Sequence, residues 1–203
     1  MFIWESHIEM PSYLQDRLIK SFDHHSRFWN TRNELFVSEI GQAMDLFVSE
    51  SDDKYIAPIT TYNNLHHFSK VEGLMDFYAD IIQKMMKEIG MYKRCKYGFE
   101  LWAQYYNNKT YGHEPHDHFI GNEIISFNHI IKPSKNKCFY FMNDEQEKNY
   151  YGKQDSGHFY AWPPWRIHGV DRVEEENINR LVVAGNISLF EYITLDGKTL
   201  VNK

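Results

Sequence analysis

The sequence predicts a mostly β protein with N-terminal helices, in which helices buttress a double-stranded β-helix (jelly roll). The hydrophobic period changes from about 3.6 to about 2 residues near position 95. Beyond that point, several short strand-like runs follow one another without helical patterns between them. The chain has 203 residues and no internal repeat or linker, so we expect one domain over 1–203. A helical support region would cover about 1–95, and the jelly-roll core about 96–192.

Three helices are expected in the support region. The clearest runs from about Val71 to Ile89, and Ser69 with Glu72 has the spacing of a capping box before it. Segments near Pro11–Phe22 and Asn33–Phe47 are weaker candidates. The clearest helix carries one apolar stripe, made of Leu74, Tyr78, Ile81, Ile82, Met85 and Ile89.

The strands of the core are predicted from short alternating or apolar runs that Gly, Pro, Asn and Asp separate. These runs are Tyr97–Tyr106, Glu123–Ile131, Cys138–Met142, His158–Trp162 and Leu181–Phe190.

Charge and cysteine content narrow the class of partner and the compartment. With 22 basic and 28 acidic residues the formal charge is −6, so we expect no nucleic-acid partner. Cys95 and Cys138 form no CxxC pair, which fits a reducing cytoplasm, or the host cytoplasm if a phage encodes the chain. Neither a signal peptide nor an apolar run of about 18 residues is apparent, so no membrane association is expected.

The densest polar signal is the run Tyr111-Gly112-His113-Glu114-Pro115-His116-Asp117-His118. On an extended strand, residues i and i+2 share a face, so His116 and His118 could reach one metal while Asp117 points away. His168, 50 positions after His118, is the best third ligand. Three neutral imidazoles suit borderline divalent metals, so this pattern admits iron, zinc or a structural histidine pair.

Arg180 follows His168 by 12 positions and opens an apolar run that begins at Leu181. A guanidinium at this position of a buried strand needs an anion, and its planar fork fits a carboxylate. The carboxylate would belong either to a ligand or to an Asp or Glu of the protein.

Taken together, these residues resemble the 2-oxoglutarate/Fe(II) oxygenase superfamily, especially its prolyl-hydroxylase-like branch and the small oxygenases of bacteria and their phages. The resemblance spans about Tyr97 to Phe190. It rests on the first histidine segment, on Trp162-Pro163-Pro164-Trp165 before His168-Gly169-Val170, and on Arg180 with Asn186.

The resemblance implies that His116, His118 and His168 hold Fe(II) and that Arg180 binds the far carboxylate of 2-oxoglutarate. It places Tyr106 beside the co-substrate, with Asn128 and Asn186 as further neighbours. O2 would be the second co-substrate, and the reaction would hydroxylate a C–H bond. A peptide or protein is the substrate class it suggests, with peptidyl proline first. Ring side chains expected to line the reaction cavity are Tyr160, Trp162, Trp165 and Phe119.

The chain departs from the commoner family pattern at one ligand. That pattern has Asp where His118 stands, so three neutral ligands would leave the metal with one more unit of positive charge. Asp117 would replace His118 as ligand if the strand carried a bulge.

Three other functions use the same residues. A cupin-type dioxygenase or isomerase would bind metal through His116, His118, Glu123 and His168, but it gives Arg180 no role. A non-catalytic jelly roll would hold a structural metal or none. A zinc hydrolase would use three His and a water.

Overall fold

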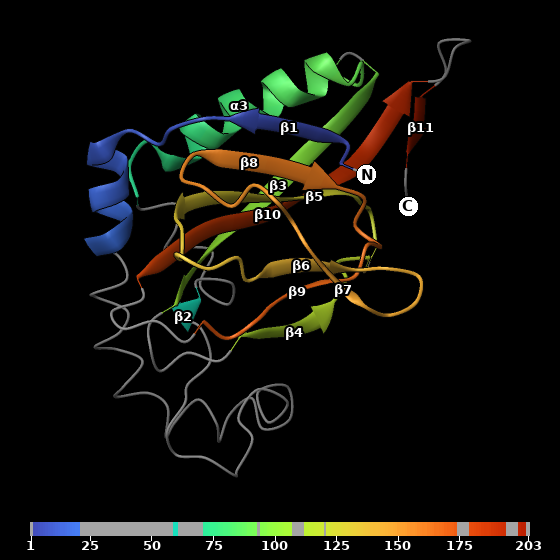
Figure 1. The fold of residues 1–203 in the computed structure, drawn as a ribbon. Coiled ribbons are helices and arrows are strands. Elements are labelled where there is room, and N and C mark those ends of the chain that lie inside the picture. The colour runs from blue at the N-terminus through green and yellow to red at the C-terminus, as the bar shows by residue number, and fades with distance from the viewer. Residues whose placement is uncertain are drawn as a thin grey trace, which may run out of the picture.

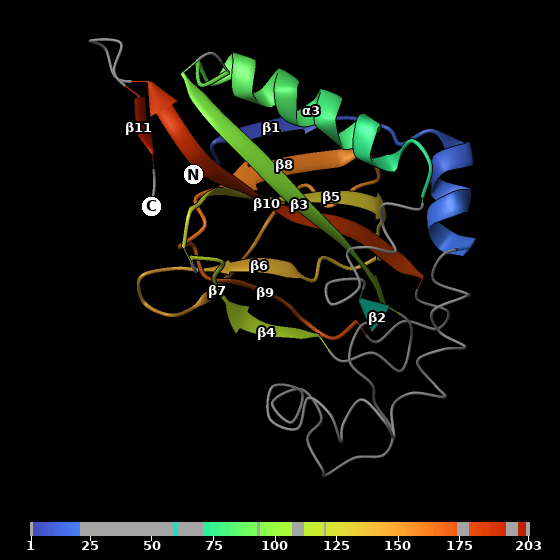
Figure 2. The same cartoon turned by 180° about the vertical axis from the view of Figure 1, so that it is seen from behind.

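Two antiparallel sheets face one another in a jelly roll, and helices lie outside the larger sheet (Figures 1 and 2). This confirms the predicted fold class. The computed structural model describes residues 2–20, 59–60, 71–92, 94–106, 112–119, 121–173, 179–193 and 199–201. The weaker helix predicted at Asn33–Phe47 lies outside these residues.

The larger sheet holds seven strands and the smaller four. In spatial order the larger contains β1 (Trp4–His7), β8 (His158–Trp162), β5 (Glu123–Lys132), β10 (Arg180–Ile193), β3 (Cys95–Tyr106) and β2 (Ile59–Thr60), while β11 (Thr199–Val201) also pairs with β10. The smaller contains β4 (His113–His116), β9 (His168–Val170), β6 (Phe139–Met142) and β7 (Lys148–Tyr150). The five strands predicted from the sequence are β3, β5, β6, β8 and β10, with shifts of one to three residues at some ends.

Helix α3 (Leu74–Glu88) covers the outer face of the larger sheet. Five of the six predicted stripe residues are buried within it, together with Met86. The predicted capping box is wrong, because the helix begins after Glu72. Gly73 is the N-cap, with a φ of 84° and no side-chain capping hydrogen bond. Glycine adopts this left-handed conformation without steric cost, so it can set the start of the helix.

The support region is not wholly helical as predicted. Residues 12–20 are helical and agree with the predicted helix near Pro11, but Trp4–His7 forms edge strand β1 beside β8. Leu14 and Leu18 are fully buried in the same core as α3. The N-terminal segment therefore contributes both to a sheet and to the helical layer.

Alternation along β10 separates the apolar core from the interior of the jelly roll. Leu181, Val183 and Ile187 belong to the core under α3. Val182 belongs to a second cluster with Phe139 and Phe141 of the smaller sheet. Arg180 and Asn186 share the parity of Val182, so they lie on the face toward the smaller sheet. The polar residues singled out on this strand are thus directed between the two sheets.

Candidate metal centre

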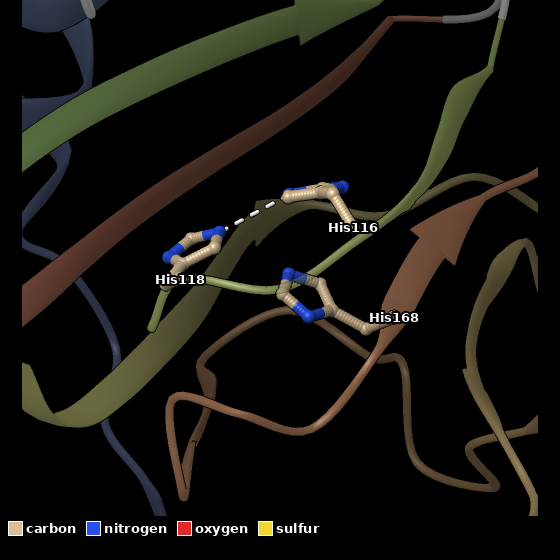
Figure 3. Close-up of side chains that lie close together, drawn as sticks. All are labelled: His116, His118 and His168. Carbon is tan, nitrogen blue, oxygen red and sulfur yellow. Dashed lines mark hydrogen bonds between the residues drawn. The ribbon is translucent and has the colours of Figure 1, made fainter. Parts of the chain in front are cut away.

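Three histidines from two segments converge at one point between the sheets (Figure 3). One ring nitrogen from each of His116, His118 and His168 lies within 4.8 Å of the others. His116 ends β4 and His168 begins the neighbouring strand β9, where the two are paired in register. Strand pairing therefore brings together ligand candidates that are far apart in the sequence.

Hydrogen bonds at Nδ1 orient all three rings. The Nδ1 atoms of His116 and His168 lie 2.8 Å and 3.0 Å from the backbone oxygens of Glu114 and Arg166. His118 Nδ1 lies 2.7 Å from Asn186 Oδ1. Because these oxygens only accept, each Nδ1 carries the proton and each neutral ring presents its Nε2 lone pair.

The spacing of the Nε2 atoms fits a shared cation. The Nε2 atoms of His116 and His118 are 3.1 Å apart (Figure 3, dashed line). Neither carries a proton in these tautomers, so no hydrogen bond can join them. Two imidazole nitrogens bound at right angles to one metal, with bonds of about 2.1 Å, lie about 3.0 Å apart. A bound divalent metal would satisfy both lone pairs.

Burial keeps these rings in the metal-binding form. It lowers the pKa of His116 to about 4, and it lowers the pKa values of His118 and His168. Neighbouring imidazoles add to the lowering at His168. The three rings are therefore neutral at pH 7, and a metal has no proton to displace.

The route by which His118 reaches the cluster differs from the prediction. Strand β4 ends at His116, so the two histidines do not share one extended strand. Instead, the backbone N–H of His118 donates to the Pro164 carbonyl at 2.8 Å, which ties the two ligand segments together. Asp117 is exposed, and its carboxylate accepts the N–H of Phe119. Within the described part of the chain, neither Asp117 nor Glu123 joins the cluster.

Asn186 connects His118 to a carboxylate. Its Nδ2 donates to Glu100 Oε1 at 3.0 Å, which fixes the orientation of the amide because a carboxylate only accepts. Its Oδ1 then accepts from both His118 and Ser126. The sequence suggested Asn186 as a co-substrate neighbour, whereas its hydrogen bonds go to His118, Ser126 and Glu100. The residues of this hydrogen-bond network lie opposite one another on the paired strands β3, β10 and β5.

A second polar group lies on the same inner face. Arg180 is 1% exposed and pairs in register with Tyr106, whose ring centroid lies 4.6 Å from the guanidinium carbon. Among the residues described, neither Nη1 nor Nη2 of Arg180 has a hydrogen-bond partner. The internal ion pair weighed from the sequence is therefore not formed with any described carboxylate. A buried, unpaired guanidinium calls for an anionic ligand.

Among the other buried polar atoms that lack partners within the described structure are Asn128 Oδ1 and Trp162 Nε1. Asn128 Nδ2 donates to Tyr160 Oη at 3.3 Å, and the Tyr160 and Trp162 rings are 5.5 Å apart. Trp162 also packs edge-on against His168, with ring centroids 5.0 Å apart. Unpaired donors and an acceptor thus lie on the face that also carries Arg180. No sequence pattern could identify the unpaired Trp162 donor, because a buried tryptophan usually indicates only packing.

Four aromatic residues were expected to line a reaction cavity, and the structure buries only two of them. Tyr160 and Trp162 are buried between the sheets, whereas Phe119 and Trp165 are 60% and 63% exposed. Both exposed rings belong to loops next to the ligands. Loops follow no hydrophobic period, so the sequence could not separate these rings from the buried ones.

Solved structures share this fold at low sequence identity. AviO1 from Streptomyces viridochromogenes Tue57 matches with a TM-score of 0.58 and 9% identity, over 91% of this chain and 88% of AviO1. A Pseudomonas putida prolyl-4-hydroxylase matches at 0.51 and 9%, over 91% of both chains. SnoN, a non-haem alpha ketoglutarate-dependent epimerase from nogalamycin biosynthesis, matches at 0.53 and 9%, over 93% of this chain and 79% of SnoN.

Sequence comparison adds no relative: no protein-family model and no curated protein matches the chain. One structural match, EvdMO1, is a longer protein, and this chain spans 45% of it. Another match aligns over 62% of this chain and 59% of its own chain. Across the described residues, no helix is long and apolar enough to cross a membrane.

Proposed function

We propose that the chain is an Fe(II)- and 2-oxoglutarate-dependent dioxygenase that hydroxylates a C–H bond. The observation that carries the proposal is the presence of two unsatisfied groups in one jelly roll. Three imidazole lone pairs converge without a proton, and a buried guanidinium lacks a described anion. The shared fold with a non-haem alpha ketoglutarate-dependent epimerase supports the same chemistry.

His116, His118 and His168 would hold the metal through Nε2. Three ligands leave coordination positions for an organic acid and O2, which favours iron over a closed structural site. When bound, the iron supplies oxidation of a C–H bond by O2, while 2-oxoglutarate is converted to succinate and CO2. The protein orients the rings through their Nδ1 partners, and the buried inner face excludes water.

Arg180 would bind the far carboxylate of 2-oxoglutarate as a bidentate partner. Tyr106 holds the guanidinium in place: its ring packs against it, and its hydroxyl donates to Gln104 at 2.9 Å. Burial raises the pKa of Tyr106 to about 12, so its hydroxyl stays neutral and can donate a hydrogen bond. Asn128 completes the set we assign to the co-substrate, because its pairing with Ala184 places it on the strand face that also carries Arg180. Its free Oδ1 can accept only from a donor such as an ordered water, not from the oxygens of 2-oxoglutarate.

Peptidyl proline is the first substrate to test. Its support is the shared fold with the Pseudomonas putida prolyl-4-hydroxylase, which also has nearly the same length. Other enzymes with this fold carry out other reactions, as the epimerase SnoN shows. A proline-rich peptide library is therefore the starting point of a substrate search.

Succinate formation tests the proposed reaction. Purified protein with Fe(II), ascorbate, 2-oxoglutarate and O2 should release succinate even without substrate, at a slow uncoupled rate. His168→Ala should abolish it, and Phe190→Ala, a change on an exposed part of β10, should leave it intact. Succinate formation no faster than with Fe(II) in the absence of the protein would contradict the proposal.

Glu123 supports a second candidate, the cupin-type metal enzyme. Its Oε2 is buried without a hydrogen-bond partner among the described residues, and its charge opposes the lowering of the His118 pKa that burial causes. In this second function the Glu123 carboxylate would be the fourth metal ligand. Glu123→Gln separates the two functions, because it should weaken metal binding at least tenfold in a cupin and only slightly in the oxygenase.

A further inference from the structure

Two exposed rings form a corner beside the metal centre. The rings of Phe119 and Trp165 are 60% and 63% exposed, and their centroids are 6.4 Å apart at an interplanar angle of 88°. Asp117 lies at the same place, since its carboxylate accepts the Phe119 backbone N–H at 3.3 Å. We call these three residues the aromatic corner.

The aromatic corner is tied to the ligands by chain connectivity and by a hydrogen bond. Phe119 directly follows His118, and Trp165 precedes His168 by three positions. The His118 N–H donates to the Pro164 carbonyl, so the two loops that carry the rings are joined. A group that contacts this corner lies close to the coordinating imidazoles.

The charge that the corner itself carries is negative, because Asp117 is exposed on the segment that bears the first two histidines. The neighbouring cation, Arg166, is directed inward, with its guanidinium carbon 3.9 Å from the centroid of the buried Phe141 ring. The faces of aromatic rings attract cations, and a carboxylate beside them strengthens this attraction. An acidic ligand would be repelled by Asp117 here.

We propose that the aromatic corner binds a lysine or arginine side chain of a polypeptide substrate, next to the residue that is oxidised. This inference rests on the proposed function, because it names the substrate class of the same site. The occupant is a polypeptide rather than a free cation, since one exposed cation–π contact changes affinity only about two- to five-fold. Further contacts along a chain are needed for useful affinity.

Peptide pools test the inference. The probes are fluorescein-labelled nonapeptides of random sequence, in which the central residue is fixed as Lys, Arg, Leu or Glu. Fluorescence polarisation is read with full-length protein, first metal-free and then with Mn(II) and 2-oxoglutarate under nitrogen. We expect the Lys and Arg pools to bind about two- to five-fold more tightly than the Leu pool, and the Glu pool most weakly. Added salt should reduce the difference.

Matched variants locate the preference. Trp165→Ala and Phe119→Ala should remove it, and Asp117→Asn should reduce it while keeping an acceptor for the Phe119 N–H. Phe190→Ala removes a ring that is 53% exposed on β10 and should leave it unchanged. Equal binding of all pools, or an unchanged preference in Trp165→Ala, would overturn the inference. The inference would also be overturned if free lysine amide displaced the peptides at the concentrations at which the peptides themselves bind, because a free cation would then be enough.

The two proposals fail separately. If Mn(II) and 2-oxoglutarate bind but the pools show no preference for a cation, only the aromatic corner is refuted. If the preference is present but metal and 2-oxoglutarate do not bind, the proposed oxygenase function is refuted instead. Thermal unfolding of each variant confirms that the surface substitutions leave the fold intact.

Discussion

Arg180 stacks on Tyr106 with 4.6 Å between the guanidinium carbon and the ring centroid, and no described group pairs with its terminal nitrogens. The register of β10 and β3 fixes this pairing. A buried charge without an anion lowers the stability of a folded protein, whereas the same charge stabilises the complex once an anion binds. Arg180 therefore links stability to co-substrate binding.

Arg180→Met should separate these two effects. We expect the ligand-free variant to be at least as stable as the wild type, because a buried charge is replaced by an apolar chain of similar length. Its affinity for 2-oxoglutarate should fall at least tenfold, which calorimetry with Mn(II) can measure. Arg180→Lys keeps the charge but not the fork, so it should bind 2-oxoglutarate with intermediate affinity. A variant less stable than the wild type yet normal in binding would contradict this assignment.

Asn186→Leu should loosen the metal site without removing a ligand. The variant deletes the acceptor that holds His118 Nδ1 at 2.7 Å, so the ring can rotate and change tautomer. Loss of such a partner lowers metal affinity about 10- to 100-fold. Competition with a fluorescent chelator measures the affinity. Glu100→Gln keeps an acceptor for Asn186 and should lower the metal affinity less. A metal affinity of Asn186→Leu equal to that of the wild type would show that Asn186 does not orient His118.

Gly169→Ala should disturb the pairing of β4 with β9. A methyl group at this position would lie 2.5 Å from Tyr140 Oη and 2.8 Å from the backbone oxygen of His113. We expect a loss of about 1–3 kcal/mol in unfolding free energy, together with weaker metal binding, because His168 precedes this residue. Gly152→Ala is the control, since no described atom lies within 4 Å of its added methyl. Denaturant unfolding compares the two, and equal stability would contradict the packing argument.

His129 should make the protein sensitive to acid independently of the metal. Its Nε2 donates to the Ile8 carbonyl at 2.7 Å, its Nδ1 accepts from Tyr78 at 2.9 Å, and burial lowers its pKa to about 4. Between pH 6.5 and 4 the unfolded chain takes up a proton that the folded protein excludes. The contribution of His129 to stability is therefore full above pH 6.5 and falls by about 3 kcal/mol as the pH approaches 4.

His129→Gln provides the comparison, because glutamine supplies one donor and one acceptor but does not titrate. The difference in unfolding free energy between wild type and variant should shrink or change sign from pH 7 to pH 4. A constant difference across this range would show that His129 is not buried in its neutral form.

The sequence predicted those strands that are long enough to show hydrophobic alternation. Strands β3, β5 and β10 have ten or more residues each, so their alternation is visible. Strands β1, β4 and β9 have four residues or fewer, too few to show a period, and none of them is among the five predicted runs. The equally short β6 was predicted because all four of its residues are apolar. The site residues His116, His118, His168 and Arg180 were predicted from the metal-binding ability of imidazole and the anion-binding ability of guanidinium. The link from His118 through Asn186 to Glu100 depends on strand register, which no local pattern encodes.

Anaerobic titration of the purified protein with Fe(II) and 2-oxoglutarate is the most direct test of the central claim. We predict a weak visible charge-transfer band that needs both additions, is absent in His168→Ala and weakens in Arg180→Met. Such a band would establish that the imidazoles and the guanidinium serve one bound complex. Iron binding without any band on addition of 2-oxoglutarate would contradict the oxygenase assignment and favour the cupin-type or structural metal site.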